Sequence, residues 1–250
     1  LKYMVDMLRE RDGEQIRVFA GGGGVIVPDE IKELEAYGVT RIYSPEDGQK
    51  MGLQGMIDDM LARSDFDPAR QAPATLEAIQ AGNRRVLSRL ITALENGTAD
   101  EKVVQTIHEM DAAPKQRAPV LGITGTGGSG KSSLTDELIR RFRFDQRDQL
   151  KLAILAVDPT RRKTGGALLG DRIRMNAIDS PHIYFRSIAT RDAAGELPES
   201  VRDIVALNRL AGFDLVIVET PGIGQGDAGV VPLGDVSLYV MTPEFGAASQ

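Results

Sequence analysis

The most chemically specific run of the sequence is GTGGSGKS, residues 125–132, which matches the phosphate-loop pattern G-x-x-x-x-G-K-S/T at every required position. Glycines let backbone N–H groups turn inward around phosphate oxygens, and the helix that follows adds partial positive charge at its N-terminus. We expect Lys131 to reach the β- and γ-phosphates and the Ser132 hydroxyl to ligate Mg²⁺. The loop therefore predicts a nucleoside triphosphate site. Its expected phosphate contacts are Gly125, Gly127, Gly128, Ser129, Gly130, Lys131, Ser132 and Ser133.

Two carboxylates lie where a metal ion bound at that loop would need them. Asp158 follows the apolar run KLAILAV, and Glu219 ends the run DLVIVE. Because the carboxyl ends of parallel strands border the ligand crevice, both acids are candidates to hold Mg²⁺ or its waters. Glu219 also opens ETPG, which has the spacing of the D-x-x-G switch of GTPases with Glu in place of Asp. The Gly222 amide is therefore a candidate sensor of the γ-phosphate.

Asp171, within GDRIRM, is a third candidate acid, and the coordination number of Mg²⁺ limits how many acids bind at once. In an octahedral shell of about six oxygens, Ser132 and the β- and γ-phosphates use about half. We therefore expect that Asp158, Asp171 and Glu219 do not all bind directly in the triphosphate state. Loss of the γ-phosphate would let the set rearrange, which makes a switch. Gln225 is a candidate to orient the attacking water, by analogy with the switch Gln of other GTPases.

A parallel α/β domain is the fold predicted to position these residues. Five apolar runs have strand length, at 120–124, 151–157, 182–188, 214–219 and 235–241. Several lack polar alternation, as expected when helices cover both faces of a sheet. Helical patterns at 130–143 and 198–211 separate some of them. We predict a P-loop NTPase doubly wound parallel sheet over residues 118–250.

The remaining residues predict a partial domain and a connector. Residues 1–62 show a strand–helix–strand–helix pattern, with elements expected over 16–20, 28–37, 39–43 and 49–61. Two parallel strands make a thin core, so we expect further βα units to precede them in the whole protein. Residues 63–117 predict a linker with helices over 75–94 and 100–110.

Composition excludes several other kinds of site. The 250 residues carry a formal charge of −6, no Cys and two His, His108 and His182. Disulfides, thiolate metal sites and multi-histidine cages are therefore excluded. The acidic balance disfavours nucleic acid as the main ligand, and no apolar run approaches the roughly 20 residues of a membrane span. No secretory signal opens the sequence, so a cytoplasmic location is expected.

The combination of GTGGSGKSSL, VDPT…TGGALLGDRIRM and VIVETPGIGQGD resembles the G-protein chaperone family that serves adenosylcobalamin-dependent acyl-CoA mutases. The resemblance covers about residues 118–250 and implies GTP or GDP as the ligand. It implies a nucleotide contact at Arg174 and Mg²⁺ contacts at Ser132, Asp158, Asp171, Glu219 and Thr220. The implied reaction is in-line attack of water on the γ-phosphate.

Residues 1–62 resemble the end of a flavodoxin-like cobalamin-binding domain. The resemblance implies that Gly23 and Gly24 line the channel for the cobalamin nucleotide tail, with Tyr43, Ser44 and Pro45 at its rim. The order of cobalamin module, linker and G-domain is similar to the fused isobutyryl-CoA mutase family. That similarity implies adenosylcobalamin as a cofactor of the whole protein and a mutase barrel as partner of this segment. A cobalamin adenosyltransferase and a second copy of the protein are further candidate partners.

Two motifs of those families do not occur in the sequence. The lower-axial-ligand motif D-x-H-x-x-G and the guanine-reading motif N-K-x-D are both absent, and we expect the flanking parts of a larger protein to supply them. Three alternatives remain at this stage. A metal-insertion GTPase would need His or Cys clusters, and a partitioning-type ATPase would carry an extra Lys where Thr126 stands. The third is a passive binding module with a purely structural loop.

Overall fold

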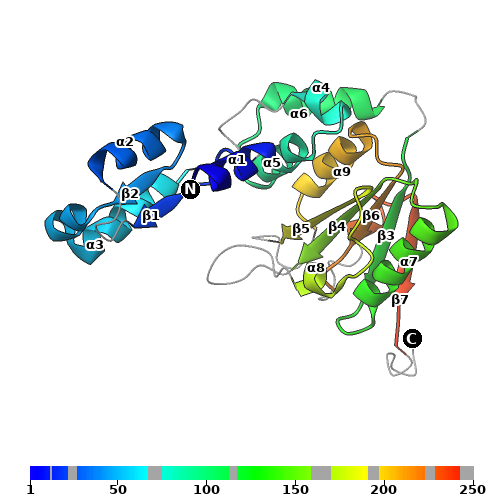
Figure 1. Ribbon diagram of the computed structural model, residues 1–250. Helices are drawn as coiled ribbons and strands as arrows, with labels where there is room; N and C mark the ends of the chain where they lie inside the picture. Colours follow the sequence, from blue (N-terminus) through cyan, green and yellow to red (C-terminus); the bar gives the residue numbers. More distant parts are fainter. Residues whose placement is uncertain are drawn as a thin grey trace. The chain divides into compact units, whose positions relative to one another are not determined.

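The computed structural model describes residues 1–11, 13–21, 27–66, 75–112, 117–158, 170–190, 197–222 and 229–242. The chain divides into two compact units, Leu1–Gln71 and Ala72–Gln250, and each is described by itself (Figure 1). The helices predicted for the linker belong to the second unit. No helix of the described residues is long and apolar enough to span a membrane.

The first unit pairs two short parallel strands with three helices. Its elements are α1 (Lys2–Glu10), β1 (Phe19–Gly21), α2 (Pro28–Tyr37), β2 (Arg41–Tyr43) and α3 (Pro45–Ser64). Val5, Val18, Val39 and Ile42 form a small buried core. The predicted helix over 28–37 is confirmed to the residue, because Pro28 suits a first helical turn and Gly38 follows the last.

The last helix of this unit begins earlier than predicted. The expected start was residue 49, whereas α3 begins at Pro45. Ser44 caps it, since the Ser44 hydroxyl accepts from the Asp47 N–H at 3.2 Å and the Asp47 carboxylate accepts from the Ser44 N–H at 2.9 Å. Gly52 has a non-helical backbone inside α3 and marks a kink. The capping pair, rather than the apolar period, therefore decides where the helix starts.

The second unit contains a parallel five-stranded sheet in the order β5–β4–β6–β3–β7. The strands are β3 (Val120–Gly125), β4 (Leu152–Asp158), β5 (Ile183–Ala189), β6 (Leu215–Glu219) and β7 (Val236–Val240). Every residue of β4 is buried, which explains its uninterrupted apolar sequence. The predicted α/β fold class is confirmed, and all five predicted strands form.

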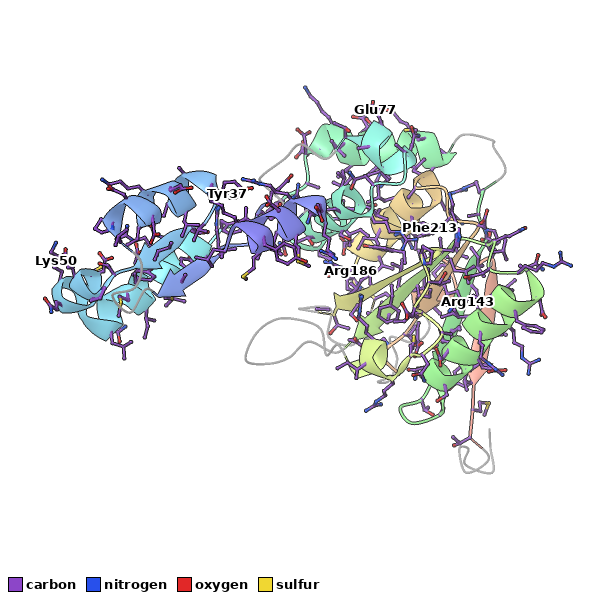
Figure 2. All side chains as sticks on the ribbon, in the orientation of Figure 1. Tyr37, Lys50, Glu77, Arg143, Arg186 and Phe213 are labelled. Carbon is purple, nitrogen blue, oxygen red and sulfur yellow. The ribbon has the colours of Figure 1, made fainter. Side chains whose placement is uncertain are left out.

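Helices cover both faces of this sheet (Figure 1). On one face, Ile139 of α7 (Lys131–Asp145) packs with Ile123, Ile154 and Ile217. α9 (Ser200–Leu210) contacts β6 and, with α5 (Arg84–Glu95) and α6 (Glu101–Ala112), forms a helical layer. Arg186, labelled in Figure 2, joins β5 to this layer through a hydrogen bond of 3.0 Å to the Thr92 hydroxyl and an ion pair with Glu95. A short helix, α8 (Gly170–Arg174), precedes β5.

The prediction of one continuous helix over 75–94 is wrong. The structure has α4 (Leu76–Gln80) and then α5, separated at Gly82, whose φ is 89°. The Asn83 side chain caps α5 by accepting from the Arg85 and Val86 N–H groups, both at 3.1 Å. A left-handed glycine followed by an Asn cap ends one helix and starts another although the apolar spacing continues.

Candidate nucleotide site

The phosphate loop joins the end of β3 to the start of α7. Gly130 has φ 91° and caps α7, so this position favours glycine. The Ser129 hydroxyl is buried and has no hydrogen-bond partner among the described residues. The first-turn N–H groups of α7 have no acceptor within the helix. The loop is therefore rich in donors, which is the chemistry that phosphate oxygens require.

Lys131 is buried at 7% exposure, and its ammonium group lies across the beginning of the loop. Its Nζ donates to the Gly125 carbonyl at 2.9 Å and to the Thr126 carbonyl at 3.0 Å. Gly222 lies against the same group, because a Cβ added there would overlap Lys131 Nζ and lie 2.8 Å from the Gly125 carbonyl oxygen. Lys131, the loop and Gly222 therefore meet at one place, although Gly222 is distant in sequence.

Glu219 connects the end of β6 to the first turns of α7. β6 pairs with β3, and the register aligns Glu219 with Ile123, near the end of β3 and shortly before the loop. The Ser132 hydroxyl donates to Glu219 Oε1 at 2.6 Å, and the Thr135 hydroxyl donates to Oε2 at 2.8 Å. Because the Ser132 hydroxyl donates its hydrogen to a carboxylate, its oxygen can act as an acceptor toward a cation. Glu219 is 3% exposed, so this arrangement is shielded from water.

Asp158 and Thr220 complete the described side chains at this edge of the sheet. Asp158 ends β4 with 5% exposure, and β4 pairs with β6 so that Ala156 aligns with Glu219. The Thr220 hydroxyl donates to the Thr124 hydroxyl at 3.1 Å, which ties the end of β6 to β3. The oxygen atoms of these hydroxyl and carboxylate groups are the type of ligand that Mg²⁺ prefers. Among the described residues, no group of three or more His, Cys, Asp or Glu side chains is placed to hold a metal ion.

The remaining predicted site residues are not among the contacts described above. Gly23, Gly24 and Gln225 lie outside the described residues. Asp171 and Arg174 belong to α8, where Arg174 is exposed and the Asp171 side chain is not described. Their roles stay predictions.

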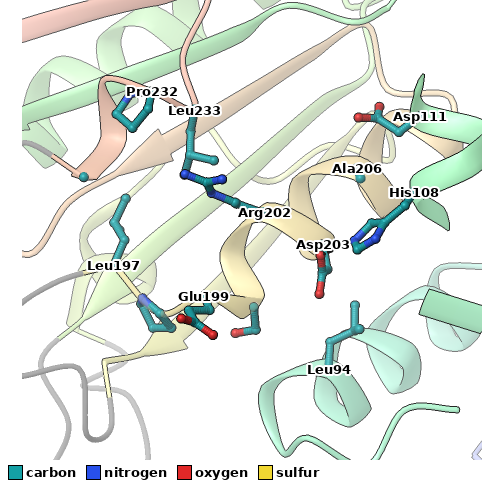
Figure 3. Close-up of a pocket in the computed structure, with 13 residues that line it drawn as sticks. Leu94, His108, Asp111, Leu197, Glu199, Arg202, Asp203, Ala206, Pro232 and Leu233 are labelled. Carbon is teal, nitrogen blue, oxygen red and sulfur yellow. Dashed lines mark hydrogen bonds and ion pairs between the residues drawn. The ribbon is translucent and has the colours of Figure 1, made fainter. Parts of the chain in front are cut away.

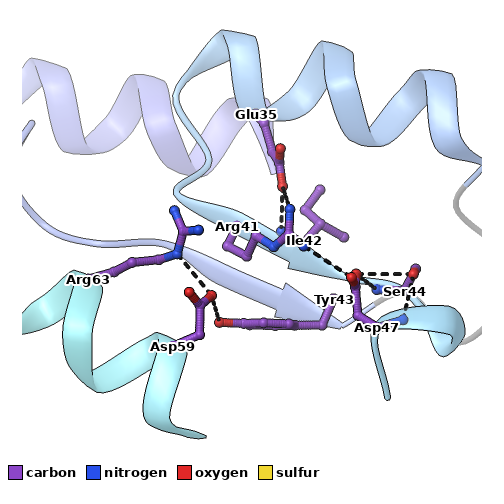
Figure 4. Close-up of polar contacts among 8 residues, drawn as sticks. All are labelled: Glu35, Arg41, Ile42, Tyr43, Ser44, Asp47, Asp59 and Arg63. Carbon is purple, nitrogen blue, oxygen red and sulfur yellow. Dashed lines mark hydrogen bonds and ion pairs between the residues drawn. The ribbon is translucent and has the colours of Figure 1, made fainter. Parts of the chain in front are cut away.

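Tyr43 and Ser44 both support α3 (Figure 4). Tyr43 is 5% exposed, and its hydroxyl donates to Asp59 Oδ2 at 2.8 Å. Burial, together with this hydrogen bond, raises the pKa of Tyr43 to about 12. The Asp59 carboxylate also accepts from Arg63 at 2.9 Å, and this bond lowers the pKa of Asp59. The predicted place of Tyr43 and Ser44 at a cobalamin channel stays a prediction beside these structural contacts.

Thr135 was missed from the sequence. It lies one helical turn beyond Lys131 and Ser132, on the side of α7 that faces Glu219, and is fully buried. A polar residue three or four positions after a loop Lys-Ser is the signal that would have indicated it.

A cavity of about 1180 Å³ lies between α6, α9 and the segment 229–233 (Figure 3). His108 and Asp203 line it and contact one another, with His108 Nε2 2.6 Å from Asp203 Oδ1. This contact joins α6 to α9. Lys131, Ser132 and Glu219 do not line this cavity.

The fold and the phosphate loop together define a P-loop nucleotide-binding protein. Residues 87–250 match the family Methylmalonyl Co-A mutase-associated GTPase MeaB, so the chain belongs to this family. The predicted resemblance to the G-protein chaperones of acyl-CoA mutases is confirmed, in preference to the metal-insertion and partitioning classes.

The chain is similar over its whole length to parts of longer proteins. It is 66% identical over 249 residues to "Fused isobutyryl-CoA mutase" of Cupriavidus metallidurans, and 54% identical over 254 residues to the protein of the same name from Geobacillus kaustophilus. In both cases 100% of this chain aligns with 23% of the relative, so the chain spans less than a quarter of their length. A crystal structure of LAO/AO transport system kinase is 25% identical with a TM-score of 0.48, covering 70% of this chain and 51% of that one.

Proposed function

We propose that this chain binds GTP with Mg²⁺ and hydrolyses the γ-phosphate, as the GTPase segment of a fused adenosylcobalamin-dependent acyl-CoA mutase. One observation carries the hydrolytic part of the proposal. Lys131, Ser132, Glu219 and Gly222 converge where β3 and β6 end, through the contacts of the buried Lys131 ammonium group and the buried Glu219 carboxylate. Membership of a GTPase family supports guanine nucleotide as the ligand.

Each residue has a distinct task in this proposal. The loop N–H groups hold the phosphates, and the Lys131 ammonium neutralises their charge in a site shielded from water. Ser132 and Asp158 would hold Mg²⁺, while Glu219 orients the Ser132 hydroxyl by accepting its hydrogen bond. Mg²⁺, when bound, supplies further neutralisation of the β- and γ-phosphate oxygens. The Gly222 amide, beside Lys131, is placed to respond to the terminal phosphoryl group.

In the whole protein, we propose that the nucleotide state gates loading of adenosylcobalamin and release of damaged cofactor. The proposed reaction of that protein is interconversion of isobutyryl-CoA and n-butyryl-CoA. Similarity over the full chain to fused isobutyryl-CoA mutases supports this assignment. The proposed partners are a mutase barrel, a cobalamin adenosyltransferase and a second copy of the protein, in the cytoplasm.

The test of the hydrolytic site compares Lys131→Ala with Lys151→Ala. Lys151 is exposed and directly precedes β4, at the opposite end of that strand from Asp158, so it controls for loss of a positive charge. Two charge-assisted hydrogen bonds to phosphate are worth about 3 kcal/mol or more, so Lys131→Ala should weaken GTP binding about 100-fold. Isothermal titration calorimetry with GTP and Mg²⁺ measures this. Binding within threefold of the wild type by a folded Lys131→Ala variant would overturn the assignment, and a parallel ATP titration tests base preference.

A further inference from the structure

A second polar pocket opens along β5, the outermost strand at one side of the described sheet. It has a volume of about 380 Å³ and takes lining residues from α5, α8 and β5. Its polar lining consists of Arg84, Ser88, Arg172, Tyr184, Arg186 and Ser187. Three arginines line this one small pocket: Arg84 and Arg186 are half-buried and Arg172 is exposed. A half-buried guanidinium group loses part of its hydration and needs compensating contacts.

Among the described residues, the positive charge of this pocket exceeds the negative charge that contacts it. Arg186 forms an ion pair with Glu95. Arg84 instead donates to backbone carbonyls, to Ile183 at 2.7 Å and also to Pro181. Among the described residues, neither Arg84 nor Arg172 has a carboxylate within ion-pair distance. Burial lowers the pKa of the Arg84 guanidinium, which is the expected effect on a cation that has lost water without gaining an anion.

Arg172 comes from a different element and points to the same strand. It donates to the Phe185 carbonyl at 3.3 Å, and its guanidinium group lies 5.9 Å from the centre of the Phe185 ring. A guanidinium group has five N–H donors, and this bond uses one of them. Arg84 and Arg172 therefore contact β5, the end strand of the described sheet, from two different helices.

Buried donors of β5 itself add a second, independent indication. Arg186 Nε and Ser187 Oγ are both buried and have no hydrogen-bond partner among the described residues. Both residues line the pocket. Buried polar atoms normally have partners, so donors of this kind beside excess positive charge indicate an absent acceptor with negative charge.

We propose that this pocket binds an oxyanion group, either a phosphate or a carboxylate, at a site separate from the phosphate loop. β4 and β6 lie between β5 and β3, and strands in a sheet are about 4.8 Å apart, so the strands that carry the two sites are roughly 14 Å apart. Planar guanidinium groups match both oxyanions through paired hydrogen bonds. The volume is near the lower end for ligand pockets, which fits a small anion or the charged end of a larger ligand.

The experiment follows backbone amide signals of Phe185 and Ser187 by nuclear magnetic resonance in the ¹⁵N-labelled 250-residue chain. Sodium phosphate and sodium succinate are titrated separately at constant ionic strength, with GDP and Mg²⁺ in excess to occupy the phosphate loop. The same titrations are repeated in Lys131→Ala, so a failure of the proposed GTP site does not affect the result. We expect saturable shifts at both amides in the millimolar range.

Two variants and one control decide the outcome. Arg172→Gln should weaken binding about tenfold, since a charge-assisted hydrogen bond is lost, and Ser187→Ala should weaken it about threefold with little change to packing. Arg140→Gln changes an exposed arginine of α7 that pairs with Glu137, and should leave binding unchanged. Tighter binding of phosphate assigns a phosphoryl source, and tighter binding of succinate assigns a carboxylate source. Shifts that do not saturate, or that persist equally in folded Arg172→Gln and Ser187→Ala, would overturn the proposal.

Discussion

Replacing Gly222 by Ala tests the convergence of the two segments that build the nucleotide site. Gly222 has φ 72°, and an alanine Cβ there would overlap Lys131 Nζ and lie 2.8 Å from the Gly125 carbonyl oxygen and 3.0 Å from the Gly127 nitrogen. Ordinary contacts are about 3.5 Å or longer, so the neighbouring groups would have to retreat. The Gly125 and Gly127 atoms are backbone, and they move only if the phosphate loop itself moves.

Gly222→Ala should have two separate effects, one on stability and one on GTP affinity. A left-handed backbone in a non-glycine residue costs about 1–2 kcal/mol, and this part lowers stability without touching the site. The overlap moves Lys131 from its two carbonyl partners at 2.9 and 3.0 Å and widens the loop. Loss of one charge-assisted hydrogen bond between Lys131 and phosphate costs about 1.5–3 kcal/mol, which is about tenfold or more in affinity. We therefore expect GTP binding to weaken at least tenfold in Gly222→Ala.

Gly212→Ala is the matched control. Gly212 has φ 76°, almost the same backbone conformation, yet a Cβ there would meet nothing within 4 Å. Both variants should therefore lose similar stability in thermal unfolding, while only Gly222→Ala should lose GTP affinity in calorimetry. If folded Gly222→Ala binds GTP within threefold of the wild type, or if both variants lose affinity equally, Gly222 does not have the position argued here.

Two further predictions concern buried hydroxyl groups. Thr135→Val removes a hydrogen-bond donor to buried Glu219 and should lower the free energy of unfolding in urea by about 1–3 kcal/mol. The control, Thr106→Val, loses an exposed hydrogen bond of 2.7 Å to the Lys102 carbonyl and should change that free energy much less. Equal losses in the two variants would contradict the role of Glu219. Tyr43 has its pKa raised to about 12 in the folded chain, so its contribution to stability is complete below about pH 10 and is lost as pH rises toward 12. Tyr43→Phe should flatten that loss in unfolding experiments between pH 9 and 12, and an unchanged alkaline profile would contradict the buried hydroxyl.

Local signals predicted much of this protein well. The phosphate loop, the five strands and the helix over 28–37 follow from short-range rules, since glycine spacing, apolar runs and an N-terminal proline act within a few residues. Local chemistry also explains the errors. The break at Gly82 and the early start of α3 at Pro45 depend on caps, and apolar periodicity does not register caps.

The sequence by itself therefore determined which residues can bind phosphate, which runs form strands and which chemistry is excluded by the lack of Cys. Tertiary structure alone decided which distant residues meet. β3 pairs with β6 rather than with β4, its successor in the chain, and this order brings Glu219 to Ser132 and Thr135 and places Gly222 beside Lys131. It also placed Arg84 and Arg172 along one edge of β5. Strand order is set by how the layers bury their apolar faces together, and that is a property of the whole chain rather than of any short segment.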